Sequence, residues 1–237
     1  MIKIKVDTHT HTNVSAHAFS TLEENLAAAA KIGLEGIAMT NHGPDLGDGA
    51  VWFHFKSARH LPRWINGVRL FPGAEVDIMD TDGRLDIEDK YLKDLEIVIA
   101  SFHTPCFKEN SPACDVTKAW LNVMENENVD ILGHMGDGRY MCDYEAVVKK
   151  AKEKGKIIEI NNHSFKVRAG SRENCRTIAQ LCKKYSVPVV LSTDAHFSAE
   201  VGVVPNSIAL LEDINFPEEL ILNTSLKKLC DYLNIEV

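Results

Sequence analysis

The sequence predicts an α/β fold of the (β/α)7 type, a TIM-like barrel with its active site at the C-terminal ends of the parallel strands. Seven short apolar runs alternate with stretches of helical character, which is typical of βαβ units and a parallel sheet. The chain has 237 residues, a length at which α/β barrels form without dividing. No repeat, low-complexity tract or linker interrupts the series. We therefore expect a single domain, residues 1–237.

The predicted strands are brief and rich in apolar side chains, as expected of strands buried on both faces. They cover residues 2–6, 36–39, 69–74, 97–101, 131–133, 157–160 and 187–192. A doubly wound open sheet would show the same alternation of strands and helices. Periodicity alone does not distinguish that sheet from a barrel.

Helical signals occupy the segments between and after these strands. The predicted helices cover residues 21–32, 116–127, 143–154, 173–185 and 225–233. The first begins at a Ser20/Thr21 cap with Glu23 and Glu24 in its first turn. The helix at 143–154 has lysines toward its end, where positive charge suits the helix dipole. Both are expected to be crossover helices.

Residues 52–64 form a less regular segment that carries several aromatic side chains and two histidines. His54 and His60 are expected at the surface or in a lid, not among ligands. The aromatic side chains could line the pocket, pack as a lid or form a subunit contact, so a homo-oligomer is left open. They are Trp52, Phe53, Phe55 and Trp64.

Composition excludes some classes of protein. A formal charge of −8 argues against a nucleic-acid partner, because nucleic-acid-binding proteins usually carry a clustered excess of Lys and Arg. No apolar run approaches a membrane span, and the N-terminal residues do not resemble a signal peptide, so no membrane association and a cytoplasmic location are expected. The six cysteines show no Cys-x-x-Cys pair and are interpreted as reduced thiols.

Histidines and carboxylates follow the predicted strands in a regular way. In chain order, the side chains that do so are His9 and His11, His42, Glu75, His103, His134, and Asp194 with His196. A single histidine at a strand end is more often structural than a ligand. Because the C-terminal ends of parallel strands share one face of a barrel, however, these residues should meet in space. Burying so many titratable groups together would be costly unless they bound metal.

Local spacing supports the same interpretation. In extended chain, side chains alternate with period two, so His9 and His11 face one side, as do Asp194 and His196. Imidazole and carboxylate ligands together suit Zn²⁺, Mn²⁺ or Fe²⁺. We expect two or three divalent ions, with Zn²⁺ as the first choice.

These motifs resemble the PHP (polymerase and histidinol phosphatase) superfamily over essentially the whole chain, and within it the single-domain phosphatases with a distorted (β/α)7 barrel and three metal ions. The motifs are Asp7-Thr8-His9-Thr10-His11, His17, Thr40-Asn41-His42, Gly73-Ala74-Glu75, Ser101-Phe102-His103, Gly133-His134 and Ser192-Thr193-Asp194-Ala195-His196. All nine ligand positions of the family are filled in order.

The resemblance implies three metal sites. The first ion would take His9, His11, Glu75 and Asp194; the second Glu75, His103 and His134; the third His17, His42 and His196. Glu75 would bridge the first pair, and Asp7 is expected to orient a histidine from outside the ligand set. Catalytic roles are expected for Glu75, Asp194 and His196.

The expected activity is hydrolysis of phosphate monoesters of small metabolites by a metal-bound hydroxide, without a Ser or Cys nucleophile. Substrate phosphate would meet cationic side chains in the loop after the sixth strand. The candidates there are His163, Arg168 and Arg172. An ordinary solvated loop with exposed charges is an equal alternative for His163 and Arg172, and Arg168 is the favoured contact.

Three other functions remain as alternatives. A phosphodiesterase or exonuclease of the same superfamily is weakened by the negative charge. An amidohydrolase also has His-x-His after its first strand, but such enzymes typically need a lysine on the fourth, and residues 97–101 contain none. A non-catalytic metal-binding module is disfavoured because no ligand position is lost and a cluster at a barrel mouth leaves open positions for substrate.

Overall fold

The computed structural model describes residues 2–237. Its centre is a sheet in which each strand pairs in parallel with the next along the chain. These strands are β1 (Val6–Asp7), β2 (Gly36–Met39), β4 (Val68–Asp77), β5 (Ile97–Ser101), β6 (Ile131–Leu132), β7 (Ile157–Asn161) and β8 (Val189–Ser192). The spatial order lacks the reversal that a doubly wound sheet requires. The predicted seven-stranded α/β barrel is therefore confirmed within the described residues.

The barrel is nearly closed between β1 and β8. At the C-terminal ends the His11 N–H donates to the Ala195 carbonyl at 2.8 Å. Nearer the N-terminal ends the Asn223 side chain lies between the strands and donates to the carbonyls of Val6 (2.8 Å) and Leu191 (2.6 Å). The Asn223 amide oxygen accepts from the Leu191 N–H at 3.1 Å. One side chain thus replaces part of the missing ladder.

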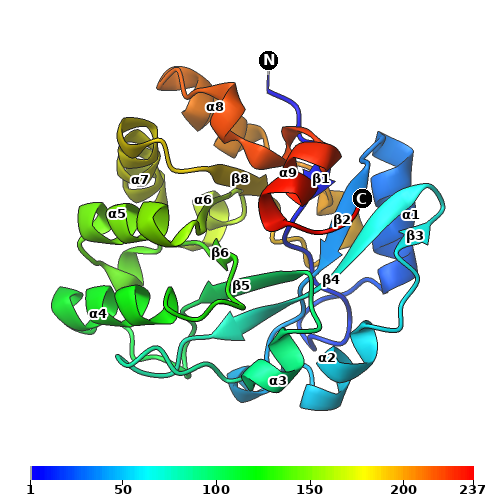
Figure 1. Cartoon of the computed structure of the whole chain (residues 1–237), viewed down its shortest axis with the longest axis horizontal. Coiled ribbons are helices and arrows are strands. Elements are labelled where there is room, and N and C mark those ends of the chain that lie inside the picture. Colours follow the sequence, from blue (N-terminus) through cyan, green and yellow to red (C-terminus); the bar gives the residue numbers. More distant parts are fainter. Residues whose placement is uncertain (1) are drawn as a thin grey trace.

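Helices surround the sheet (Figure 1). They are α1 (Leu22–Ile32), α2 (Trp52–Ala58), α3 (Asp89–Leu92), α4 (Ala113–Val123), α5 (Tyr144–Lys154), α6 (Ser164–Val167), α7 (Ser171–Tyr185), α8 (Pro205–Asp213) and α9 (Leu226–Leu233). The expected cap of α1 is present as a capping box, in which Thr21 and Glu24 exchange hydrogen bonds. Asp143 is the N-cap of α5, and its side chain accepts from the Ala146 N–H.

The barrel interior changes character along its axis. At the N-terminal end it is filled by apolar side chains of the strands and of α9: Val6, Ala38, Phe71, Ile97, Ile99, Ile131, Ile157, Val190, Leu226 and Leu229. Because side chains alternate along a strand, the interior series of β7 continues from Ile157 to Glu159 and Asn161. The barrel interior is therefore apolar at its N-terminal end and polar at its C-terminal end.

Two strand predictions need correction. Residues 2–6 were expected to form the first strand, but regular pairing is confined to Val6–Asp7, because the Lys5 N–H bonds to the Asn223 carbonyl at 2.8 Å. The third predicted strand extends to Asp77, so Glu75 lies within β4 and not after it.

The aromatic segment contains α2 and a short strand, β3 (Trp64–Ile65), antiparallel to β4. Phe55 is buried, whereas Trp52, Phe53 and Trp64 are about half exposed. Across residues 2–237, helices are either too short or too polar to cross a membrane.

Candidate metal centre

The structure brings the nine expected ligand residues together at the C-terminal end of the barrel. Above them is a cavity of about 590 Å³. Five of the nine line it: His17, His42, His103, Asp194 and His196. The other four are buried beneath: His9, His11, Glu75 and His134.

One group of four side chains matches the set that the resemblance implies for the first ion. A ligand atom from each of His9, His11, Glu75 and Asp194 lies within 4.8 Å of the others. The Glu75 Oε2 is 3.1 Å from His9 Nε2 and 3.3 Å from His11 Nε2. Asp194 Oδ1 is 3.1 Å from His11 Nε2. All four residues are buried.

A second group is formed by His42, Glu75 and His103, again with ligand atoms within 4.8 Å of one another. The resemblance implies His134 in place of His42. His134 is nonetheless adjacent, because its Nε2 lies 2.8 Å from Glu75 Oε1. His42 joins this group through its Nδ1, 3.0 Å from Glu75 Oε2. Glu75 thus contacts different histidines through its two oxygens.

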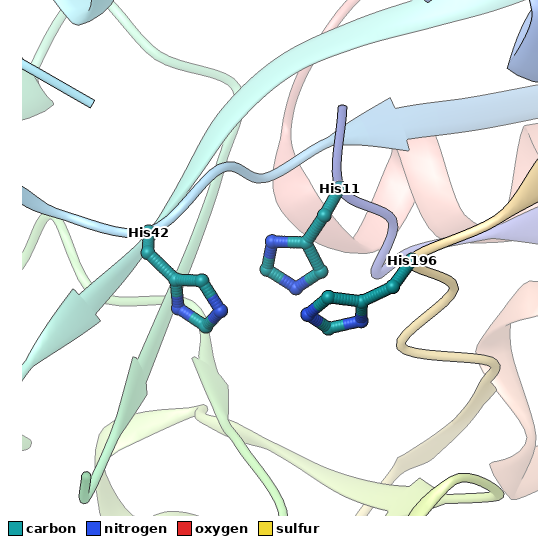
Figure 2. Close-up of side chains that lie close together, drawn as sticks. All are labelled: His11, His42 and His196. Atoms are coloured by element: carbon teal, nitrogen blue, oxygen red, sulfur yellow. The ribbon is translucent and has the colours of Figure 1, made fainter. Parts of the chain in front are cut away.

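A third group consists of His11, His42 and His196, whose rings converge in Figure 2. The resemblance implies His17 in place of His11. His17 lies at the cavity rim, with its Nε2 2.8 Å from the Nε2 of His196 and its ring stacked on that of His42. The three groups share members, so they form one continuous cluster.

The cluster has too few protons to satisfy its own polar atoms. His9 and His11 bring two Nε2 atoms within 3.1 Å, and one proton at most fits between them. Within the described chain, His42 Nδ1 and Glu75 Oε2 are buried and lie 3.0 Å apart, but they are not aligned for a hydrogen bond with each other or with any other group. Buried polar atoms are normally satisfied. Lone pairs that converge in this way fit a bound cation, and the donor types fit Zn²⁺, Mn²⁺ or Fe²⁺.

Electrostatics keeps the two carboxylates of the cluster ionised. Burial alone would raise the pKa of Glu75, but the neighbouring His9 and His42 bring that pKa well below its ordinary value. Burial is likewise outweighed at Asp194, where His9 and a hydrogen bond from His11 hold the pKa well below the ordinary value. Both side chains are therefore in the form that binds metal.

The histidines differ from one another. Burial lowers the pKa of His103 to about 3 and that of His11 well below its ordinary value, so both are neutral near pH 7. Burial would also lower the pKa of His9, but the carboxylates of Glu75 and Glu159 raise it well above the usual range. In the metal-free protein His9 would hold a proton that metal binding releases.

Three further carboxylates orient histidines of the cluster, and sequence reasoning missed all of them. Glu159 is 2.7 Å from His9 Nδ1, and Asp77 is 2.9 Å from His103 Nδ1. Asp48 is 2.6 Å from the Nδ1 of His17. Each contact leaves Nε2 directed at the cluster. Two of these residues could have been found from the sequence. Glu159 is a charged residue inside an apolar strand, and Asp77 follows Glu75 by two residues and so lies on the same face of the strand.

Asp7 does not have the expected role. Its carboxylate accepts from the hydroxyl of Thr193 at 2.6 Å and from the Gly202 N–H at 2.9 Å, and it bonds to no imidazole among the residues described. Asp7 therefore holds the loop after β8 against β1. Its effect on Asp194 and His196 is through the backbone.

The expected substrate-binding residues are placed differently from one another. Arg168 and His163 line the cavity, and the His163 ring is 5.9 Å from that of His196. Arg168 Nη1 donates to Asp194 Oδ2 at 3.2 Å and to the Ser164 hydroxyl at 3.1 Å. Arg172 does not line this cavity, and its guanidinium packs over the ring of Phe165.

Known proteins match this chain in sequence over nearly its full length. A family model described as PHP domain matches residues 7–163. A probable phosphatase of Clostridium botulinum (strain Langeland) is 45% identical over 96% of this chain and 93% of its own length. A probable phosphatase of Caldanaerobacter subterraneus is 46% identical over 98% of this chain and 92% of its own.

Two solved structures share the fold. Histidinol phosphate phosphatase from Lactococcus lactis, crystallised with zinc, L-histidinol and phosphate, has a TM-score of 0.64 and 17% identity, over 90% of this chain and 94% of that one. A chain of archaeal ribonuclease P, in a cryo-EM structure with mature tRNA, has a TM-score of 0.57 and 19% identity, over 97% of this chain and 91% of that one. At such identities the likeness concerns the fold alone.

Proposed function

Since this chain belongs to the PHP domain family, we propose that it is a metal-dependent phosphatase that hydrolyses phosphate monoesters of small metabolites. The observation that carries the proposal is the convergence of buried carboxylates and imidazoles on the floor of an open cavity, with the Arg168 guanidinium in its wall. The relatives named as probable phosphatases support the same reaction class. Zn²⁺ is the proposed metal, with Mn²⁺ and Fe²⁺ as alternatives that fit the same ligands.

Divalent ions bound in the three groups would neutralise charge on phosphate oxygens and lower the pKa of water. The contribution of the chain is placement. Glu75 connects the first two groups, because Oε2 lies 3.1 Å from His9 Nε2 and Oε1 lies 2.8 Å from His134 Nε2. Asp194 directs its Oδ1 toward the cluster and its Oδ2 toward the Arg168 guanidinium. We assign catalytic roles to Glu75, in the buried floor, and to Asp194 and His196, which line the cavity.

Arg168 and His163 are the proposed contacts to the substrate. Arg168 is held by Ser164 and Asp194 through Nη1, and its buried Nε lies 3.5 Å from Asp137 Oδ2. A guanidinium fixed in this way can pair with a phosphate oxygen without first being ordered. Arg139, also in the wall, already donates from Nε, Nη1 and Nη2 to Asp137 and Glu109, whereas Nη2 of Arg168 forms no hydrogen bond to the described residues. We therefore place phosphate beside Arg168.

The test combines metal analysis with an assay on the same sample. Elemental analysis should find about two to three equivalents of zinc, manganese or iron. Hydrolysis of p-nitrophenyl phosphate should fall at least about tenfold after chelation with EDTA and return on adding Zn²⁺ or Mn²⁺. Bis(p-nitrophenyl) phosphate, assayed in parallel, distinguishes diesters. Preference for the diester would overturn the monoester assignment, and absence of metal after reconstitution would overturn the whole proposal.

A further inference from the structure

Glu159 is a buried acid at the centre of the apolar strand β7. Its carboxylate accepts four hydrogen bonds, two at each oxygen. Oε1 is 2.7 Å from His9 Nδ1 and accepts from the Ser192 hydroxyl. Oε2 accepts from the His134 N–H at 2.6 Å and from the Asn161 amide at 3.2 Å. A buried carboxylate is costly unless it is hydrogen-bonded, and packing alone does not explain a charged side chain in an apolar strand.

The contact at Oε1 determines which nitrogen of His9 faces the cluster. A carboxylate only accepts hydrogen bonds, so Nδ1 of His9 must carry its proton toward Glu159. In the neutral ring Nε2 then has its lone pair free, and Nε2 is the atom that lies 3.1 Å from Glu75. Glu159 therefore sets both the tautomer and the direction of this imidazole.

The contact at Oε2 acts on a second histidine through the backbone. His134 has φ +28°, a left-handed conformation that non-glycine residues adopt at a cost. The bond from its N–H to Glu159 holds that conformation. This backbone conformation directs the His134 ring so that its Nε2 lies 2.8 Å from Glu75 Oε1.

We infer that Glu159 is a positioning residue that prepares two histidines, His9 and His134, for metal binding, each beside a different oxygen of Glu75. The inference rests on the proposed function, because it supposes that the cluster binds metal. Glu159 itself is buried and does not line the cavity. It acts on the affinity for metal through the other two residues.

Glu159→Gln tests the inference with almost no change of shape. An amide has one oxygen, so it can accept from His9 or from the His134 N–H, but its NH₂ must oppose the other. Either orientation disturbs one histidine. Zn²⁺ affinity, measured by competition with a chromophoric chelator, should fall about 10- to 100-fold. Asp130→Asn is the matched control, since Asp130 accepts from the Val98 N–H at the other end of the barrel, and its Zn²⁺ affinity should stay within about threefold of wild type.

Histidine tautomers supply a readout that a general loss of packing would not move. In a ¹⁵N spectrum of the zinc-loaded wild type, the assigned His9 ring should carry its proton on Nδ1. In Glu159→Gln the His9 ring should lose this signature or show both tautomers. If the His9 signature is kept, the amide oxygen has turned toward His9, and the lower Zn²⁺ affinity should come from a displaced His134. If the variant does not fold, the wild-type spectrum still decides, because a proton on Nε2 of His9 would overturn the inference.

The outcomes separate the two proposals. If wild type binds no Zn²⁺, the proposed function fails and the inference fails with it. If wild type binds Zn²⁺ and Glu159→Gln binds it with equal affinity and stoichiometry, only the inference fails. A loss in Glu159→Gln that Asp130→Asn does not share supports both.

Discussion

Two residues of the cluster have left-handed backbone conformations, His134 at φ +28° and Asp194 at φ +54°. Such conformations are uncommon outside glycine, and they concentrate at functional sites where the surroundings hold them. Here Glu159 holds the first. Asp7 holds the loop that contains the second, through its bonds to Thr193 and Gly202. Backbone strain at these positions serves to direct side chains inward.

Asp194→Asn should separate the chemistry of this residue from its backbone role. Asparagine tolerates the left-handed conformation nearly as well as aspartate, so the circular dichroism spectrum should be unchanged. The variant removes one of the two carboxylates of the first group, and activity should fall on the order of 100-fold or more with loss of bound zinc. Full activity with full zinc content would contradict the role of Asp194.

Asp130 should make stability depend on pH far from the metal centre. Burial raises the pKa of Asp130 to about 6 from its ordinary 3.8. The folded protein therefore binds more protons than the unfolded chain between these values, and the stabilising contribution of this group is lost as pH rises through about 4 to 6. In Asp130→Asn that loss is absent, while the amide oxygen can still accept from Val98.

The difference in melting temperature, Asp130→Asn minus wild type, should accordingly increase from pH 4 to pH 7 in metal-free protein. Thermal unfolding at several pH values measures it. A difference that stays constant over this range would show that Asp130 has no raised pKa in the folded state.

At the scale of elements, the seam between β1 and β8 depends on a residue from neither strand. Asn223 lies in the segment before α9 and satisfies three backbone groups of Val6 and Leu191. These two strands lead directly to His9 and Asp194. The C-terminal segment thus determines how the two sides of the first ligand group are spaced.

Asn223→Ala should lower the free energy of unfolding by about 3 kcal/mol, because buried N–H and C=O groups would lose their partners. Urea denaturation measures the loss. Asn126→Ala is a suitable control, since Asn126 also forms several hydrogen bonds, to Asp89 and Asn128, but it is only half-buried, so water can replace them. A cost below about 1 kcal/mol is expected there. Equal costs in the two variants would contradict the special role of the seam.

Elements with strong local signals could be predicted from sequence, and those that depend on tertiary contacts could not. The first crossover helix was recognisable because Thr21 and Glu24 form a capping box within four residues. Strand β1 was overestimated because residues 2–5 look like a strand, but the Lys5 N–H bonds to the carbonyl of Asn223, about 220 residues away. Helix α8 was missed because it has no side-chain cap, although Pro205 marks its start.

The candidate site shows the same division. Strand-end histidines such as His9 and His42 were recognisable, since the barrel brings every strand end to one face. The grouping of His42 with Glu75, and of His11 with His196, was not, because it depends on ring directions that spacing does not specify. Glu159 was overlooked because its partners come from three other segments.

Taken as a whole, the molecule divides along the barrel axis. The N-terminal end has an apolar interior closed by α9, which contributes the hydrophobic burial that stabilises the fold. The C-terminal end instead buries several ionisable side chains against one another, and burial alone disfavours their charged forms. Stability should therefore be uneven, with the polar end dependent on bound cations.

Metal removal should lower stability without unfolding the barrel. Zn²⁺ at about 100 times its dissociation constant contributes about 2.7 kcal/mol per site. In a domain of this size, each such site corresponds to a melting temperature about 5–10 °C higher than in EDTA, and two or three sites correspond to proportionally more. Calorimetry on wild type in both conditions measures the shift.

Hydrogen exchange should show where that stability resides. On chelation, amide protection should fall in the segments that follow the strands, including the His134 N–H, because the side chains around it lose the cation that offsets their burial. Protection should persist at the N-terminal ends, for example at the Val98 N–H bonded to Asp130, since the apolar interior there is unchanged. A uniform loss along the axis would mean that metal supports the entire fold, and no change at either end would mean that the ions contribute to chemistry alone.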